Sequence, residues 1–239
     1  MVSPRQVEVL PTRAALVARS RDLVVERVHA AVAARGRCTL VLAGGSTPKP
    51  LYAALSQASL PWAQMHILWG DERYVPLDHP DSNAGMAKAV WLDQVPIPAA
   101  QIYWPPTGEP TPEAAAALYN DTVASVLAPD PHLDIVLLGM GDDGHTASLF
   151  PHTEALQVGD RPVTVGYKGD NPRLTLTAST LNQSRCVLFL VAGANKQTAL
   201  AAVFAETGDA AAYPSRLIQP TGELWWLLDA EAGAGIGDF

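Results

Sequence analysis

Short apolar runs alternate with helical patterns along this chain, and that alternation constrains the fold more than any other feature. The apolar runs are Cys38–Ala43, His66–Trp69, Ile135–Gly139, Arg185–Val191 and Leu224–Leu228. Such runs are typical of strands that are covered on both faces. The helical patterns between them are Ala14–Ala34, Leu51–Gln57, Ala84–Leu92, Glu113–Leu127 and Lys196–Glu206. Strands joined through helices form right-handed crossovers, so the sequence predicts an α/β fold with a mainly parallel sheet.

The length fits one large domain or two small ones. Of the 239 residues, 48% are hydrophobic and 17% are charged, which is an ordinary globular composition. The proline-rich stretch Pro105–Pro112 is typical of a surface loop rather than a domain boundary. We therefore expect a single domain over residues 1–239.

The charge balance limits the possible partners. The formal net charge is −8, which argues against non-specific binding to nucleic acid. An anionic ligand would have to be attracted locally, by a few cations and backbone N–H groups. We expect a small-molecule substrate and no nucleic-acid partner.

Nothing in the chain indicates export or membrane insertion. The segment Met1–Val9 carries charges and lacks the apolar core of a secretion signal. The longest apolar stretch, Cys186–Ala194, is far shorter than the ~20 residues that span a bilayer. Cys38 and Cys186 lie in apolar runs and have neither disulfide nor zinc spacing. We expect a cytoplasmic chain with two reduced core thiols and no membrane contact.

A polar or glycine-rich cluster follows each of four predicted strands. The clusters are Gly44–Thr47, Asp71–Arg73, Gly141–His145 and Gly193–Lys196. In parallel α/β sheets, ligands bind beyond the carboxyl ends of the strands. We therefore expect the clusters to meet on one rim and to form a binding site there.

The Gly44–Pro48 cluster lies between a predicted strand and a predicted helix. Glycines let the backbone approach a ligand closely, and free N–H groups at a helix start favour an anion. The bland alternative is a tight turn in which Ser46 and Thr47 cap a helix that has Pro48 at its first position. The cluster matches neither GxxxxGK nor GxGxxG, so a nucleotide is disfavoured.

Three charged residues, Asp71, Glu72 and Arg73, follow a predicted strand directly. Arginine is the side chain best suited to bidentate phosphate contact. A solvated loop is the alternative for this tripeptide if it is taken alone. Further along, Ser82 and Asn83 are placed to cap the next helix, as Thr111 is before Pro112.

Lys196 and Arg173 are two further candidate phosphate cations. Lys196 lies at the start of a predicted helix, and Arg173 opens the segment that follows Asn171 and Pro172. A lone lysine or arginine is more often a solvated surface charge. Convergence with the other strand ends is what favours a binding role for both.

His145 is the strongest candidate for a general base, because histidine titrates near neutral pH. Among six histidines, it alone lies in a glycine-flanked strand-end turn beside carboxylates. Asp143 is placed either to orient the imidazole or the loop, or to cap a helix. The other histidines are expected to be structural or surface residues: His29, His66, His79, His132 and His152.

The remaining catalytic options are weak. No set of His, Cys and carboxylate residues has metal-ligand spacing, so we expect no metal and no cofactor. Ser46 and Ser148 lie outside a GxSxG motif and have no histidine at a recognised spacing. Water activated by His145 is therefore favoured over an acyl-enzyme.

The ordered motifs resemble those of the 6-phosphogluconolactonases, over roughly Gly36 to Asp229. The segment DGHTASLFP is highly specific, whereas GGSTP is shared with relatives, and Ala43 stands where that family often has Ser. The matching segments are Gly44–Pro48, Asp71–Asn83, Leu137–Pro151, Pro172–Thr177 and Val191–Lys196.

The resemblance implies a three-layer α/β/α fold with a mainly parallel, Rossmann-like sheet and a few extra strands. It also implies hydrolysis of 6-phosphogluconolactone, without a cofactor, in the oxidative pentose phosphate pathway. His145 matches that family's proposed general base, and Arg73 and Lys196 match its phosphate-binding cations. The expected catalytic residues are His145 and Asp143. The expected substrate-binding residues are Gly44, Gly45, Ser46, Thr47, Asp71, Arg73, Arg173 and Lys196.

Two other functions fit the same fold. Glucosamine-6-phosphate deaminases resemble the chain around Asp143 and His145, but they have a glutamate five residues after the histidine, where this chain has Phe150. A non-catalytic sugar-phosphate sensor would need a DNA-binding module, and the chain has neither room for one nor a basic patch. We expect a lactonase that is a monomer or a weak homodimer.

Overall fold

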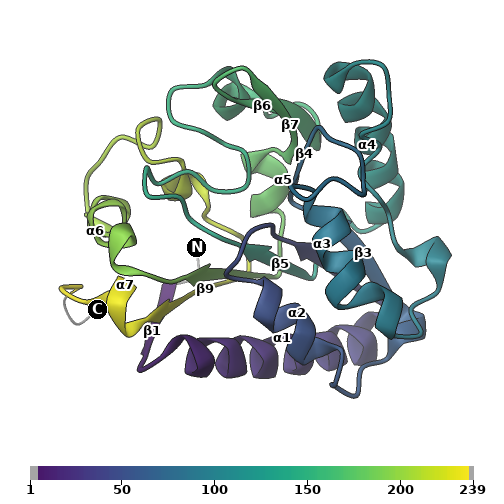
Figure 1. The fold of residues 1–239 in the computed structure, drawn as a ribbon, viewed down its shortest axis with the longest axis horizontal. Coiled ribbons are helices and arrows are strands. Elements are labelled where there is room, and N and C mark those ends of the chain that lie inside the picture. Colours follow the sequence, from purple (N-terminus) through teal and green to yellow (C-terminus); the bar gives the residue numbers. More distant parts are fainter. Residues whose placement is uncertain (1–4, 237–239) are drawn as a thin grey trace.

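A computed structural model describes residues 5–236 and places six strands in one parallel sheet (Figure 1). Every neighbouring pair runs in the same direction, so the carboxyl ends of all six strands lie at one edge. In spatial order the strands are β1 (Arg5–Leu10), β9 (Glu223–Asp229), β8 (Cys186–Val191), β5 (Ile135–Leu138), β2 (Cys38–Leu42) and β3 (Met65–Trp69).

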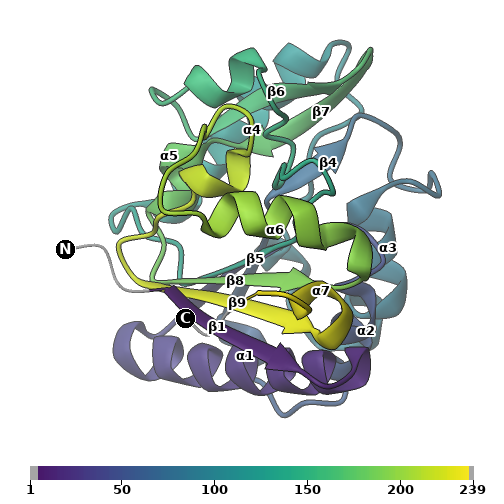
Figure 2. The same cartoon turned by 90° about the vertical axis from the view of Figure 1, so that its left-hand side faces the viewer.

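Helices cover both faces of this sheet, because the buried strands alternate their side chains between two cores. Leu40 and Leu42 belong to one core, and Val41 belongs to the other. Figure 2 shows α1 and α6 on opposite sides of the sheet. The first core packs against α1 (Arg13–Arg35), α2 (Lys49–Leu55) and α3 (Asn83–Val90). The second packs against α4 (Pro112–Leu127), α5 (Ala178–Asn182) and α6 (Gln197–Phe204), while the short α7 (Ala230–Gly233) follows β9.

A smaller antiparallel sheet adjoins the second core. Its strands, in order, are β4 (Asp71–Arg73), β7 (Asn171–Leu176) and β6 (Val163–Lys168). Gly70 joins β3 to β4 and bonds to both sheets, since its N–H donates to the Leu42 carbonyl at 2.9 Å and its carbonyl accepts from Leu176 N–H at 2.8 Å. The predicted three-layer fold with a few extra strands is confirmed.

All five predicted strands and all five predicted helices are present, with ends shifted by one or two residues. Strand β1, a half-exposed edge strand, was not predicted because its residues do not form an apolar run. The first four residues of the segment Met1–Val9 lie outside the described range. Strands β6 and β7 were not predicted from the sequence, and the residues of β4 were interpreted as a polar cluster only.

Two of the predicted helix caps are confirmed. The Thr111 hydroxyl accepts from a backbone N–H three residues on, at 3.1 Å, and the Ser82 hydroxyl does the same at 2.9 Å. The cap predicted at Ser46 and Thr47 is wrong. A turn intervenes, so α2 begins at Lys49 with no side-chain cap.

Cys38 and Cys186 are free and buried, as expected. Burial raises the pKa of the Cys38 thiol, and it raises that of Cys186 to about 12. Within residues 5–236, no helix is long and apolar enough to cross a membrane. The single-domain organisation stays a prediction.

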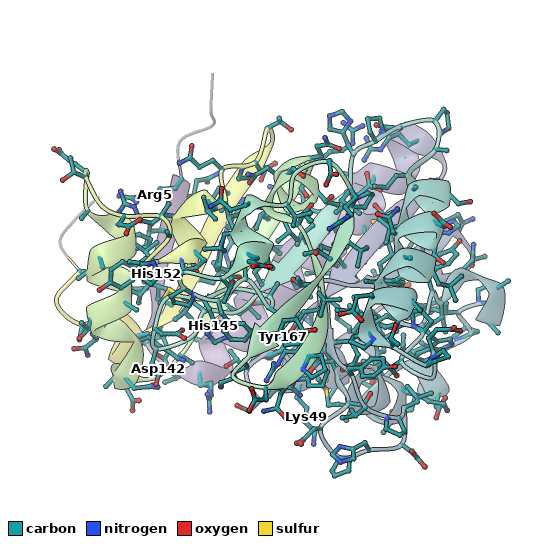
Figure 3. The ribbon with its side chains drawn as sticks, turned by 90° about the horizontal axis from the view of Figure 1, so that it is seen from above. Arg5, Lys49, Asp142, His145, His152 and Tyr167 are labelled. Carbon is teal, nitrogen blue, oxygen red and sulfur yellow. The ribbon has the colours of Figure 1, made fainter. Side chains whose placement is uncertain are left out.

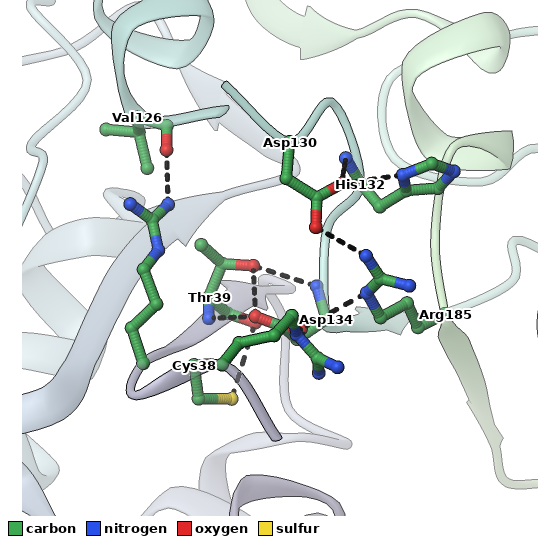
Figure 4. A network of polar contacts seen from close by, with 9 residues as sticks. Cys38, Thr39, Val126, Asp130, His132, Asp134 and Arg185 are labelled. Atoms are coloured by element: carbon green, nitrogen blue, oxygen red, sulfur yellow. Dashed lines mark hydrogen bonds and ion pairs between the residues drawn. The ribbon is translucent and has the colours of Figure 1, made fainter. Parts of the chain in front are cut away.

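Asp134, just before β5, ties three elements together at the amino-terminal edge of the sheet (Figure 4). Its side chain is 6% exposed. It accepts from Thr39 N–H of β2 at 2.8 Å and from Arg35 Nη2 of α1 at 2.6 Å. Arg185 Nε lies 3.6 Å away, just before β8. The amino ends of β2, β5 and β8 are therefore held in register by one carboxylate.

Removing this carboxylate should destabilise the fold. We expect Asp134→Ala to lower the free energy of unfolding by about 2–4 kcal/mol, because it leaves buried donors without an acceptor. Asp130→Ala is the matched control, since that exposed aspartate also pairs with Arg185 but should cost less than about 1 kcal/mol. Urea unfolding measures both variants. Equal losses would contradict a special role for Asp134.

Candidate active site

A cleft of about 300 Å³ opens at the carboxyl edge of the main sheet. All four predicted clusters contribute to its lining: Gly44–Thr47 after β2, Asp71 and Arg73 after β3, His145 after β5 and Lys196 after β8. The expectation that these strand ends meet on one rim is confirmed. Arg173 reaches the same cleft from β7 of the small sheet.

Asp143 holds the imidazole of His145. Its Oδ1 lies 2.5 Å from His145 Nδ1 and also accepts from the His145 backbone N–H at 3.0 Å. No helix begins at this turn, so the alternative of a helix cap at Asp143 is wrong. An ionised carboxylate on Nδ1 assigns the ring proton to that nitrogen and leaves the lone pair on Nε2. Figure 3 marks the position of His145.

The protonation state of Asp143 follows from two opposing effects. Partial burial alone would raise the pKa of Asp143, but hydrogen bonds from the backbone and ring of His145 lower it further than burial raises it. The carboxylate is therefore ionised at neutral pH and can orient the imidazole.

Gly141 leaves the space that the His145–Asp143 pair occupies. A Cβ atom on Gly141 would lie 2.1 Å from His145 Nδ1 and 2.4 Å from Asp143 Oδ1. The Gly141 N–H also donates to the His145 carbonyl at 2.8 Å, which closes the turn. The pair can adopt this geometry only if residue 141 is glycine.

Phe150 packs beside the imidazole. Its ring is 5% exposed and its centre lies 4.5 Å from the centre of the His145 ring. The guanidinium of Arg173 lies 5.5 Å from the same phenyl ring. One apolar ring therefore packs against both the candidate base and the guanidinium of Arg173.

Arg73 and Arg173 are direct partners across β4 and β7. Burial lowers the pKa of Arg173, nearby Asp71 opposes that effect, and Arg73 lowers the pKa further. In the described part of the chain, the Nε atoms of both guanidinium groups are buried without a hydrogen-bond partner. Two adjacent guanidinium groups with unused donors form a site suited to an anion.

A buried hydrogen bond joins the two sides of the cleft. Ser148, fully buried on the loop after His145, donates to Asp71 Oδ2 at 2.7 Å. Asn83 Nδ2 donates to the Asp71 carbonyl at 2.9 Å. The Ser148 hydroxyl therefore acts in positioning Asp71, and it does not line the cleft.

Glu72 fixes Arg73 from the opposite face of β4. Its carboxylate is 2% exposed and accepts from the backbone N–H groups of Asn83 and Ala84, at 2.8 and 2.7 Å. Burial raises the pKa of Glu72, although these N–H groups act in the opposite direction. Glu72 therefore anchors the amino end of α3 to the strand that presents Arg73.

Two polar side chains that line the cleft were not assigned to the site from the sequence. Asn83 was expected only to cap α3, and Lys168 was not considered. The signal for Lys168 was present, because the Gly169-Asp170 turn between two β-rich segments is typical of a hairpin. Among residues 5–236, no group of three or more His, Cys, Asp or Glu side chains is arranged to hold a metal ion.

Comparisons with known proteins show the family to which this chain belongs. The family model described as glucosamine-6-phosphate isomerases/6-phosphogluconolactonase matches residues 11–226. A 6-phosphogluconolactonase of Nostoc sp. strain PCC 7120 is 57% identical over 236 residues, which cover 97% of this chain and 98% of the relative. A 6-phosphogluconolactonase of Synechocystis sp. strain PCC 6803 is 52% identical over 235 residues, with the same coverage of 97% and 98%.

Solved structures show the same fold. The 6-phosphogluconolactonase of Trypanosoma brucei has a TM-score of 0.88 at 31% identity, covering 99% of this chain and 100% of that one. The chain therefore belongs to the glucosamine-6-phosphate isomerase/6-phosphogluconolactonase family. Within that family it belongs to the 6-phosphogluconolactonases and is an enzyme with that activity.

The space at Gly141 yields a prediction for this activity. Gly141→Ala should lower kcat by on the order of 10²-fold, because the new methyl group displaces the His145–Asp143 pair and a displaced general base loses most of its effect. Gly108→Ala is the matched control, since a Cβ there meets nothing within 4 Å. Lactone hydrolysis measured beside the thermal midpoint of each variant tests this. A fully active Gly141→Ala protein would contradict it.

Proposed function

We propose that this chain hydrolyses 6-phospho-D-glucono-1,5-lactone through a water molecule activated by His145. The observation that supports this most is the 2.5 Å contact between His145 Nδ1 and Asp143, at a cleft that Arg73, Arg173 and Lys196 also line. The cleft thus combines an oriented base with cations for a phosphate. The reaction belongs to the pentose phosphate pathway.

The chemistry requires one base and one water molecule. His145 Nε2 takes a proton from water while the water oxygen attacks the lactone carbonyl carbon, which forms a tetrahedral oxyanion. The oxyanion then collapses, the bond from carbon to ring oxygen breaks, and the imidazolium returns its proton to that oxygen. Asp143 keeps the ring oriented and stabilises the imidazolium in between. Backbone N–H groups of the glycine-rich turns stabilise the oxyanion.

The phosphate end of the substrate lies against the cations. Arg73 and Arg173 offer two guanidinium groups from neighbouring strands, and Lys196 adds an ammonium from the end of β8. The Gly44–Thr47 loop contacts the ligand through its backbone, which Gly45 allows with a φ of +95°. Asp71 lines the same cleft, where its carboxylate can accept hydrogen bonds from substrate hydroxyl groups.

Removal of the base tests the mechanism. We expect His145→Ala to lower kcat by about 10²–10⁴-fold, the usual contribution of a general base, while binding of the product 6-phosphogluconate persists. Acid release from the lactone, corrected for spontaneous hydrolysis, measures kcat, and calorimetry measures product binding. Near-normal kcat in His145→Ala would mean that another group activates the water.

Removal of a guanidinium tests the phosphate site. Arg173→Ala and Arg73→Ala should each lower kcat/KM for the phosphorylated lactone by about 10- to 100-fold, as for a lost charge-assisted hydrogen bond. The unphosphorylated glucono-lactone should be affected far less. Arg161→Ala, at an exposed arginine outside the cleft, is the control. Equal losses on both lactones would assign the two arginines a structural role.

The lowered pKa of Asp143 yields a pH prediction. The pKa of Asp143 in the folded protein lies below its ordinary value. The carboxylate therefore contributes fully to the free energy of unfolding when the pH is above the ordinary pKa, and this contribution is lost as the pH falls through the lowered pKa. Asp143 thus stays charged across the range in which a histidine base is protonated. Asp143→Asn should lower kcat on the order of 10²-fold. It should also move the acidic limb of the kcat/KM profile to lower pH, since the imidazolium loses its counter-charge. An unmoved limb would contradict this.

We further infer a cytoplasmic enzyme that acts as a monomer or a weak homodimer. Two buried unpaired thiols fit a reducing compartment. Every group in the proposed mechanism comes from one chain, so the chemistry requires no second subunit.

A further inference from the structure

Lys168 is a cation of the cleft that the mechanism above does not use. It ends β6, at the tip of the β6–β7 hairpin, and it lines the same cleft as His145 and Arg173. The labelled Tyr167 in Figure 3 marks this hairpin, which lies beside the loop that carries His145.

The pleat of β6 directs Lys168 toward the cleft. Side chains two residues apart in a strand share a face. Gly166 faces the loop after His145 so closely that a Cβ there would lie 2.2 Å from the Ser148 carbonyl oxygen. Tyr167, on the other face, donates to Glu113 of α4 at 3.1 Å. Lys168 therefore lies on the same face of the hairpin as Gly166. The hydrogen bond of Tyr167 attaches the opposite face to α4.

The register places Lys168 close to Arg173. Gly166 pairs with Arg173 and Lys168 pairs with Asn171, so Lys168 and Arg173 are diagonal neighbours on one face. Diagonal neighbours in an antiparallel pair lie about 7–8 Å apart, within reach of long side chains. Arg73 is the direct partner of Arg173 on its other side. Three cations therefore lie along one face of the small sheet.

The charges of the cleft fit an anion at this place. The chain has a net charge of −8. The described residues that line the cleft nevertheless carry four cations and only one carboxylate, not counting His145. Within residues 5–236, the Lys168 side chain makes no hydrogen bond or ion pair, whereas Lys88 Nζ lies 2.6 Å from Asp93. Lys168 is thus a free donor beside two guanidinium groups.

We propose that Lys168 is a further substrate-binding residue, whose ammonium contacts the phosphate of the lactone from the hairpin side of the cleft. This assignment rests on the proposed function, since it needs a phosphate at Arg73 and Arg173. Lys168 is exposed, so its contribution affects capture of the substrate rather than the chemical step.

Steady-state kinetics of Lys168→Met on the two lactones test the assignment. For the phosphorylated lactone we expect KM to rise about tenfold with kcat within about twofold, the effect of one partly screened charged contact. The increase should shrink at high salt, and Lys168→Arg should retain most of the affinity. For the unphosphorylated lactone we expect no change. Lys49→Met is the matched control, because Lys49 is also exposed and its loss changes the net charge equally, yet it does not line the cleft.

Each outcome decides the question. A Lys168→Met protein that behaves like Lys49→Met, or that loses equally on both lactones, would overturn the assignment. If Arg173→Ala removes the preference for the phosphorylated lactone and Lys168→Met does not, the Lys168 assignment fails and the proposed function stands. If the unmodified enzyme shows no preference for the phosphorylated lactone, both fail.

Discussion

The hydrogen bond between Ser148 and Asp71 is the contact on which the arrangement of the cleft depends. The distance from Ser148 Oγ to Asp71 Oδ2 is 2.7 Å, and Ser148 is fully buried. Ser148 follows the base His145 on the loop after β5, and Asp71 precedes the cation Arg73 on β4. Since buried polar groups are costly to leave unpaired, this one bond fixes the spacing between the two ends of the proposed substrate site.

The fold makes that contact possible because two sheets meet at Gly70. The parallel sheet brings the base loop and the Gly44–Thr47 loop to one edge, whereas the small antiparallel sheet brings Arg73 and Arg173 over it. Neither sheet alone presents both a base and a pair of arginines. At the amino-terminal edge, Asp134 holds β2, β5 and β8 in register, so that their carboxyl ends lie together at the cleft.

The sequence predicted the parallel sheet well, because buried strands form apolar runs and each polar cluster follows directly after one of them. It placed His145 and Arg73 at the rim for the same reason. It did not place Lys168, because the Gly169-Asp170 turn indicates a hairpin but not where that hairpin lies. Its position at the cleft follows from the long-range pairing of β7 with β4. The sequence also predicted a helix cap at Ser46 that the structure does not contain, because turn residues and capping residues have the same local sequence pattern.

We propose that one cleft holds the phosphate at the arginines while the lactone carbon lies beside His145. A crystal structure with 6-phosphogluconate bound tests it most directly. We expect phosphate oxygens within hydrogen-bond distance of Arg73, Arg173 and Lys196, and a carboxylate within reach of His145 Nε2. A product bound in the reverse direction, with its phosphate at His145 and its carboxylate at the arginines, would contradict this arrangement.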